Sequence, residues 1–209
     1  MARAWKKSGK RLPLGMVAVL ICLGFTLPAL AAEPQDHIKQ TLDAVTAVLD
    51  DPQLQGSGNV ADRKQRVRKI IYETFDFQQM AKEALGPQWD KLTPQQREEF
   101  VGLFGDLFER SYNLLVLRFL GARKTIYGKE SVQQNRATVH TTLVSKSDEK
   151  LPTDYQLINK GQRWAVFDVV VDGVSLATTY RAQFGKIIRE SSYEALLQKI
   201  KTKLERESF

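Results

Sequence analysis

Residues 164–175 have the sequence WAVFDVVVDGVS, and this stretch decides the fold. The segment from Trp164 to Val171 is almost wholly apolar and rich in valine, which favours a buried β-strand. Asp172 and Gly173 then supply a turn. Strict alternation along the strand predicts one mixed face and one wholly apolar face, the latter made of Ala165, Phe167, Val169 and Val171.

Three further strands are predicted before this one. The hydrophobic pattern has a period of two over residues 124–131, 134–146 and 151–159. Turn-forming residues lie between the later segments, at 147–150 and 159–161. Sequential strands with such short links must be antiparallel. The pattern therefore predicts a curved four-stranded antiparallel sheet.

Helical periodicity occurs on both sides of the strands in the sequence. Before the strands, apolar residues recur at helical spacing over 34–49, from 61 onward, over 75–85, and from the capping box at 93–96 to about 119. After the strands, they do so over 176–190 and again from there to about 205. Thr93, Pro94 and Gln96 form a capping box that begins the longest helix. The predicted class is α+β, with N- and C-terminal helices covering one face of the sheet in a single domain spanning 32–209.

Residues 1–31 have the three parts of a secretory signal peptide. A basic stretch precedes an apolar run from Leu14 to Phe25, and small residues at Ala29 and Ala31 predict cleavage after Ala31. The alternative is an uncleaved anchor, because the apolar region approaches the ~20 residues that a membrane span needs. Pro28 and the small residues favour cleavage, so we expect a soluble periplasmic protein.

The charge of the chain belongs mainly to this leader. The whole sequence has 31 basic and 24 acidic residues, a net charge of +7. Five of the basic residues and none of the acidic ones lie in 1–31, which leaves a net charge of +2 for 32–209. We therefore expect no nucleic-acid partner. The only cysteine, Cys22, also lies in the leader, so the predicted mature chain has no thiol for a disulfide or a metal.

A search for catalytic groups finds no complete set. His37 and His140, the only histidines, have neither His-x-x-x-His nor Glu-x-x-His spacing, so no metal site is predicted. Residues 173–177 resemble a nucleophile elbow, but both histidines precede Ser175 and we expect this serine to cap a helix. Asp168 and Asp172 could act as a carboxylate pair, although turn and cap roles explain them better. No catalytic residue or cofactor is predicted.

The apolar residues of the helices and strands admit two interpretations. They could form a closed core, or they could leave a cavity between the curved sheet and the helices, an arrangement that often holds a ligand. The positions that would line such a cavity are Phe104, Phe108 and Tyr112 on the longest helix and Val139, Leu143, Tyr155, Leu157, Phe167, Val169 and Val171 on the strands.

Two blocks of the sequence resemble the MlaC family, the periplasmic phospholipid-binding component of the Mla lipid-transport system, also called the toluene-tolerance or auxiliary-transport family. The order and spacing of many residues carry this resemblance, since none of the motifs is catalytic. The first block contains Phe75-Asp76-Phe77, Met80-Ala81, Leu85-Gly86, Trp89, Thr93, Gln96, Phe100, Phe104, Leu107 and Tyr112. The second contains residues 164–175, 180–184 and the Leu196-Leu197 helix.

The resemblance implies a soluble carrier that holds phospholipid acyl chains between sheet and helices, which makes the ten positions above lipid-binding residues. It implies exchange with an inner-membrane ABC transporter bearing an MCE-domain subunit and with an outer-membrane lipoprotein–porin complex, in the service of outer-membrane lipid asymmetry. No cofactor is implied beyond the lipid cargo, and we expect a monomer. The alternatives are an enzyme on a cone-shaped α+β scaffold, using Asp168 or His140, and a periplasmic adaptor without a ligand.

Overall fold

The fold is built around an antiparallel β-sheet. A computed structural model describes residue 1 and residues 33–119, 124–145, 147–161 and 163–206, with only the backbone for 57 and 112–119. The strands are β1 (Lys124–Gln133), β2 (Arg136–Val144), β3 (Lys150–Asn159), β4 (Trp164–Val171) and β5 (Val174–Ser175). Each pairs antiparallel with the next, in the order β1-β2-β3-β4-β5. The four predicted strands are confirmed, and β5 is an addition.

The short strand β5 results from a tight turn after β4. Asp172 and Gly173 both have positive φ, at 49° and 79°. This conformation turns the chain sharply back on itself. Val174 therefore pairs with Val171, and the helix that follows begins immediately beside the sheet.

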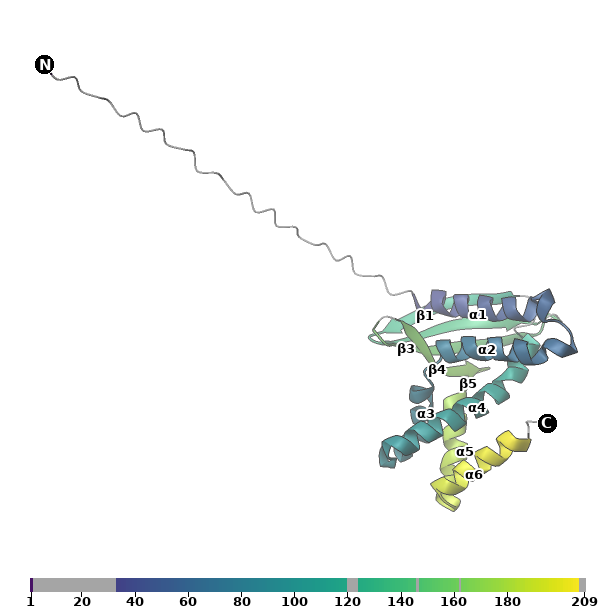
Figure 1. Cartoon of the computed structure of the whole chain (residues 1–209), viewed down its shortest axis with the longest axis vertical. Coiled ribbons are helices and arrows are strands. Elements are labelled where there is room, and N and C mark those ends of the chain that lie inside the picture. Colours follow the sequence, from purple (N-terminus) through teal and green to yellow (C-terminus); the bar gives the residue numbers. More distant parts are fainter. Residues whose placement is uncertain (2–32, 120–123, 146, 162, 207–209) are drawn as a thin grey trace. The chain divides into compact units, whose positions relative to one another are not determined.

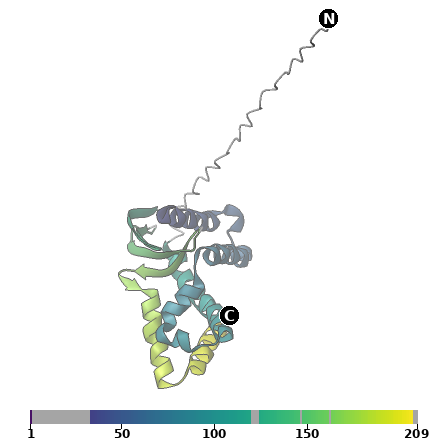
Figure 2. The same ribbon diagram turned by 90° about the vertical axis from the view of Figure 1, so that its left-hand side faces the viewer.

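Two N-terminal helices lie along the sheet (Figures 1 and 2). They are α1 (Pro34–Asp50) and α2 (Val60–Thr74), joined through two short 3₁₀ turns at Pro52–Leu54 and Ser57–Asn59. Each helix is amphipathic and buries residues at helical spacing. In α1 these include Ile38, Leu42 and Val45, and in α2 they include Val67 and Ile71.

Four more helices gather at one end of the sheet, below it in Figures 1 and 2. They are α3 (Phe77–Leu85), α4 (Pro94–Phe119), α5 (Leu176–Glu190) and α6 (Tyr193–Arg206), with a 3₁₀ turn at Gly86–Lys91. The predicted capping box begins α4: the Thr93 amide donates to Gln96 Oε1 at 2.9 Å, and the Gln96 amide donates to Thr93 Oγ1 at 3.2 Å. The α+β class is confirmed.

One buried apolar cluster extends through all of these layers. It includes Ile38 of α1, Val139 of β2, Phe104 of α4 and Leu196 of α6, each at most 1 % exposed. Within the described ranges, no helix has the length and apolarity required to cross a membrane. Residues 2–31 of the predicted leader lie outside the described residues.

Candidate functional site

Most of the predicted strand residues share one face of the sheet. Residues directly opposite each other in antiparallel strands point to the same side, and the register pairs Val139 with Tyr155 and Tyr155 with Val169. We call this side the inner face. It consists of Ala137, Val139, Thr141 and Leu143 on β2, Leu151, Thr153, Tyr155 and Leu157 on β3, and Val166, Val169 and Val171 on β4. Six of the seven predicted strand residues belong to it.

Phe167 lies on the opposite face because β4 contains a β-bulge. The pairing with β3 shifts by one residue between Gln156 and Leu157, which leaves Phe167 as the extra residue. Arg136 lies on the opposite face too, and its guanidinium carbon is 4.6 Å from the centroid of the Phe167 ring. The prediction that Ala165 and Phe167 share a face with Val169 is therefore wrong: the bulge breaks the alternation, and Ala165 pairs with Ile158 on the opposite face.

Two threonines extend the inner face, and the sequence analysis did not select them. Thr141 and Thr153 are paired and are 4 % and 1 % exposed. The Thr141 hydroxyl donates to the Thr153 carbonyl at 2.6 Å, and the Thr153 hydroxyl donates to the Leu151 carbonyl at 3.2 Å. Because both hydroxyls bond to the backbone, the face stays compatible with an apolar ligand. The alternation Val139-x-Thr141-x-Leu143 was the available signal.

Helix α1 covers the inner face over β1 and β2. Its first turn is fixed by the Gln35 amide, which donates to Glu130 Oε2 on β1 at 2.8 Å. His37, in the same turn, has a buried Nε2 without a hydrogen-bond partner among the described residues. Burial lowers the pKa of His37, and the positive charge of Arg163 lowers it further. This end of α1 therefore favours a neutral imidazole.

The inner face is closed at its centre and partly exposed at one end. Val139 and Val169 are fully buried and Tyr155 is 3 % exposed. Leu151 and Val171, near the β2–β3 turn and the end of β4, are only half-buried. Leu151 and Val171 are therefore the least buried residues of the inner face.

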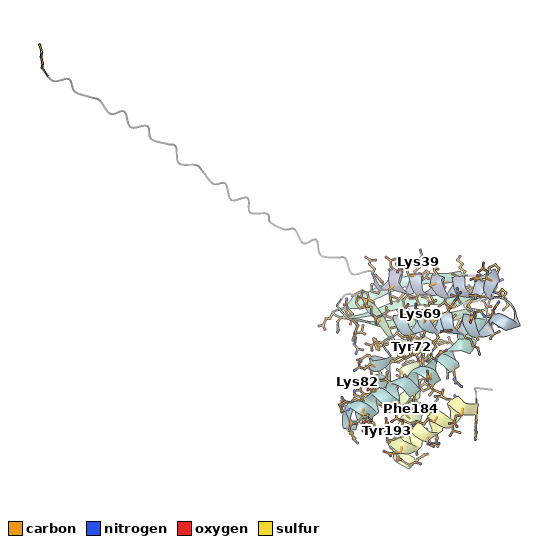
Figure 3. The ribbon with its side chains drawn as sticks, viewed as in Figure 1. Lys39, Lys69, Tyr72, Lys82, Phe184 and Tyr193 are labelled. Carbon is orange, nitrogen blue, oxygen red and sulfur yellow. The ribbon has the colours of Figure 1, made fainter. Side chains whose placement is uncertain are left out.

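The two predicted phenylalanines of α4, whose ring centroids lie 6.4 Å apart, pack against different further neighbours. Phe108 packs against Phe75, with ring centroids 5.4 Å apart, and Phe75 forms a bridge with Val166 of the inner face. Phe104 instead packs edge-to-face on Phe184 of α5 at 5.9 Å, in the helical part seen in Figure 3. Phe108 thus lies near the sheet, whereas Phe104 joins α4 to α5.

An ion-pair cluster joins α2 to α4 near Phe108, around Tyr72 in Figure 3. The Arg68 guanidinium bonds to Asp106, at 2.6 Å, and to the buried carboxylate of Glu109. The Tyr72 hydroxyl donates to Asp106 at 3.1 Å, and burial together with that negative charge raises the pKa of Tyr72 to about 12. A Cβ on Gly105 would lie 2.9 Å from the Tyr72 hydroxyl. Glycine at this position therefore allows the two helices to approach.

Comparison with known proteins identifies the family. The family model described as MlaC protein matches residues 39–202. The chain belongs to the MlaC family. The toluene tolerance protein ttg2D of Pseudomonas putida is 22 % identical over 175 residues, which are 83 % of this chain and 81 % of that protein. The resemblance predicted from the sequence is confirmed.

A solved structure is also similar to this MlaC family member. It is the phospholipid-binding protein from Ralstonia solanacearum, in complex with a phospholipid. The TM-score is 0.72 and the identity 25 %, over 82 % of this chain and 97 % of the other. The two chains therefore share the arrangement of sheet and helices over most of their length.

Polar groups around Ser175 join β4 to α5 in this MlaC family chain. Ser175 Oγ accepts from the Thr178 amide at 3.0 Å, which confirms the predicted helix cap. Asp168 accepts from the Ser175 hydroxyl at 2.5 Å and from the Ala177 amide at 3.0 Å. Burial raises the pKa of Asp168, and these hydrogen bonds oppose that shift. The group has a structural explanation as the junction between strand and helix.

The other candidate polar groups lie apart from this junction. His140, on the opposite face of the sheet, places Nδ1 3.0 Å from Asp154 Oδ1. Asp172, the second carboxylate of the considered pair, is exposed in the turn after β4. In the part of the chain that the structure describes, no group of three or more histidine, aspartate or glutamate side chains could hold a metal ion.

Two hollows on the described surface lie away from the inner face. One, of about 340 Å³, is lined by residues that include Trp89, Pro94 and Arg97, where α4 begins. The other, of about 730 Å³, lies on α6. None of the ten predicted residues lines either hollow as described. The side chain of Tyr112 lies outside the described residues, so its predicted role stays a prediction.

Proposed function

We propose that this MlaC family protein binds a phospholipid, with its acyl chains between the inner face and the covering helices, and carries it through water. The observation that carries the proposal is the mostly apolar inner face, which spans β2, β3 and β4 and centres on Val139, Tyr155 and Val169. The similar Ralstonia solanacearum protein is described in complex with a phospholipid, which supports the same cargo here.

The energetics of an acyl chain fit such a carrier. Each buried methylene contributes roughly 0.8 kcal/mol, so two chains of about 15 methylenes represent on the order of 20 kcal/mol before any cost of ordering. A lipid would therefore leave a membrane very slowly without a protein that replaces this burial. The apolar core under α1 and α2 can supply it only if the layers separate, because Val139 and Val169 are fully buried. We expect entry from the partly exposed end at Val171.

The polar groups support a binding role over a catalytic one. Ser175 and Asp168 hold the start of α5 through hydrogen bonds of 2.5–3.0 Å. His140 lies on the opposite face of the sheet from the proposed cargo, beside Asp154. We infer that the protein is not an enzyme and that its chemistry is limited to taking up and releasing lipid.

The family and the N-terminal sequence support a proposed location and proposed partners. We infer that residues 1–31 are cleaved and that 32–209 act in the periplasm as a monomer. The partners we propose are an inner-membrane ABC transporter with an MCE-domain subunit and an outer-membrane lipoprotein–porin complex. Exchange between them would maintain the lipid asymmetry of the outer membrane. Because the gross burial of two acyl chains is so large, we expect these partners to open the protein or to offer comparable apolar surface.

Lipid extraction tests this function directly. The full chain is expressed in its native host, recovered from the soluble fraction, extracted with organic solvent and analysed by mass spectrometry. We expect about one phospholipid per protein, because the proposal places the cargo at a single site, between the inner face and the covering helices. An extract without phospholipid would contradict the carrier and favour a ligand-free adaptor. Intact mass on the same sample checks cleavage after Ala31.

A further inference from the structure

Helix α1 covers the inner face and is joined to the rest of the protein at its C-terminal end. It lies along the sheet in Figure 1 and buries Ile38, Leu42 and Val45. Its C-terminal end continues through residues 51–59 into α2. If residues 1–31 are removed as proposed above, only Ala32 and Glu33 precede the helix. Helix α1 can therefore lift from the sheet without carrying another element with it.

Helix α2, the other helix on the inner face, is fixed at two places. The Arg68 guanidinium bonds to Asp106 and Glu109 of α4. Beyond the last turn of α2, Phe75 forms a bridge with Val166 of β4. Because both contacts tie α2 to other elements, it provides a fixed support beside which α1 can move.

His37 is a titratable group that α1 buries in its first turn. Its Nε2 is buried and has no hydrogen-bond partner among the described residues. The pKa of His37 is lowered, first by burial and then by the positive charge of Arg163. The first turn of a helix also carries the positive end of the helix dipole, which disfavours a further positive charge. A proton on His37 is therefore disfavoured while α1 lies on the sheet.

The charged groups of β1 and of α1 itself have other partners or face water. Glu130 on β1 accepts from the Gln35 amide at 2.8 Å. Asp36, the residue before His37, is exposed. Further along the helix, the negative charge of Asp43 acts on Tyr127 of β1 and raises the pKa of that tyrosine. In the described part of the chain, none of these carboxylates offsets the lowered pKa of His37.

The other neighbouring elements add a positive charge and no counter-ion for it. Arg163, just before β4, donates to the Glu73 carbonyl at the end of α2 at 2.5 Å, which holds its charge in place. The Glu73 carboxylate is exposed and lies 3.9 Å from Lys69. Strand β2 places no titratable side chain on the inner face. The surroundings of His37 therefore favour its neutral form.

We propose that α1 is a lid on the inner face and that protonation of His37 releases it, so that lipid enters and leaves faster at mildly acidic pH. This role rests on the proposed function, which supplies the cargo. With α1 lifted, the imidazole meets water and regains its ordinary pKa of 6.5. If only the open form takes up the proton, its population rises about tenfold between about pH 7.5 and about pH 5.5. That ratio is the same however rare the open form is.

Lipid exchange at these two pH values tests the release. The full chain is expressed in its native host and recovered from the soluble fraction with its bound phospholipid. It is then mixed with vesicles of deuterium-labelled phosphatidylcholine, a lipid whose charge is the same at both pH values. Mass spectrometry follows the labelled lipid that appears on the protein. We expect exchange to be about three- to tenfold faster at the lower pH. Equal rates would overturn the proposal.

The two histidines of the chain form a matched pair of controls. His37→Gln should remove the effect of pH on exchange. His140→Gln should keep it, because His140 lies on the opposite face of the sheet. An effect of pH that persists in His37→Gln, or that is lost in His140→Gln, would overturn the assignment to His37.

A disulfide between α1 and α2 tests the lid without changing His37. The hydroxyl oxygens of Thr41 and Thr74 lie 3.2 Å apart, so cysteines at these positions bring two sulfur atoms close to the S–S bond length of about 2.05 Å. The only natural cysteine, Cys22, lies in the predicted leader. Reduced Thr41→Cys/Thr74→Cys protein should exchange lipid faster at the lower pH, and the oxidised form should not. An acceleration that survives oxidation would overturn α1 as the moving element.

Hydrogen exchange of the α1 amides separates the lid from its cargo, because it needs no bound lipid. The protection factors of residues 35–50 should fall by up to about tenfold at the lower pH, and in His37→Gln they should not. A protein that yields no phospholipid but loses this protection would contradict the proposed function and support the release of α1. A protein that carries phospholipid while its α1 protection ignores pH would overturn the release and leave the carrier standing.

Discussion

Replacing Val171 by tryptophan would fill the partly exposed end of the inner face without a change of charge. Val171 is half-buried and pairs with Thr153 and Val174. The preceding residue, Val170, is also half-buried but lies on the opposite face, where it pairs with Ser175. Val170→Trp is therefore a closely matched control: the same strand and the same substitution, on the other side of the sheet.

The size of the effect follows from the volume of the new side chain. Tryptophan has about seven more side-chain non-hydrogen atoms than valine and displaces a similar number of methylenes, worth roughly 6 kcal/mol of burial at about 0.8 kcal/mol each. That is an upper limit, since a chain can shift, but even a third of it weakens binding more than tenfold. Because Val171 is partly exposed, the ring can lean toward water. We therefore expect the substitution to lower the free energy of unfolding by less than about 1.5 kcal/mol.

Lipid mass spectrometry and thermal unfolding on the same samples decide the matter. Val171→Trp should lose most of its phospholipid while its Tm falls by no more than about 5 °C, as a change of that size produces in a domain of this length. Val170→Trp should keep its lipid. Wild-type stoichiometry in a folded Val171→Trp protein would refute the placement, and equal lipid loss in both variants would show that the inner face is not special.

Three further changes test parts of the account. Ser175→Ala should reduce the free energy of unfolding by about 0.5–2 kcal/mol in urea titrations, through loss of the cap, and should leave bound lipid unchanged; loss of lipid in the folded variant would revive a functional role. Arg68→Ala should reduce the free energy of unfolding by about 1–3 kcal/mol, because the buried carboxylate of Glu109 loses a cation. The control Lys69→Ala, which breaks an exposed ion pair, should reduce it by less than about 1 kcal/mol, and equal effects of the two variants would contradict a stabilising role for the cluster. Burial lowers the pKa of His37 from its usual 6.5, so at mildly acidic pH the unfolded chain binds more protons than the folded one. The free energy of unfolding should therefore fall as the pH is lowered from about 7 to about 5, and an equally steep fall in His37→Gln would contradict this.

The strand order and the inner face could largely be predicted from sequence, because alternation of apolar residues reports which side chains share a side. Val139, Tyr155 and Val169 were selected on that pattern alone, and the register places them together. Phe167 could not be placed in this way. A bulge depends on how two strands pair, and WAVFDVVV is apolar on both sides, so no break in the pattern marks the shift.

Helix periodicity predicted which residues of α4 are buried, but it could not predict which residues they pack against. Phe104 and Phe108 are both buried, as their spacing predicts. Phe104 contacts Phe184 of α5, whereas Phe108 contacts Phe75. These contacts depend on how helices from distant parts of the chain pack, which the periodicity of one helix does not report. The sequence did not predict β5, because a strand of only two residues, Val174 and Ser175, is too short to show an alternating pattern.

Photo-crosslinking with a phospholipid that carries a diazirine on an acyl chain tests the central claim most directly. After loading and irradiation, peptide mass spectrometry locates the adducts. The account predicts adducts on inner-face residues such as Val139, Tyr155 and Val171, and none on their opposite-face neighbours Thr138 and Gln156. Adducts concentrated on the opposite face, or a fully loaded protein with none on the inner face, would contradict it.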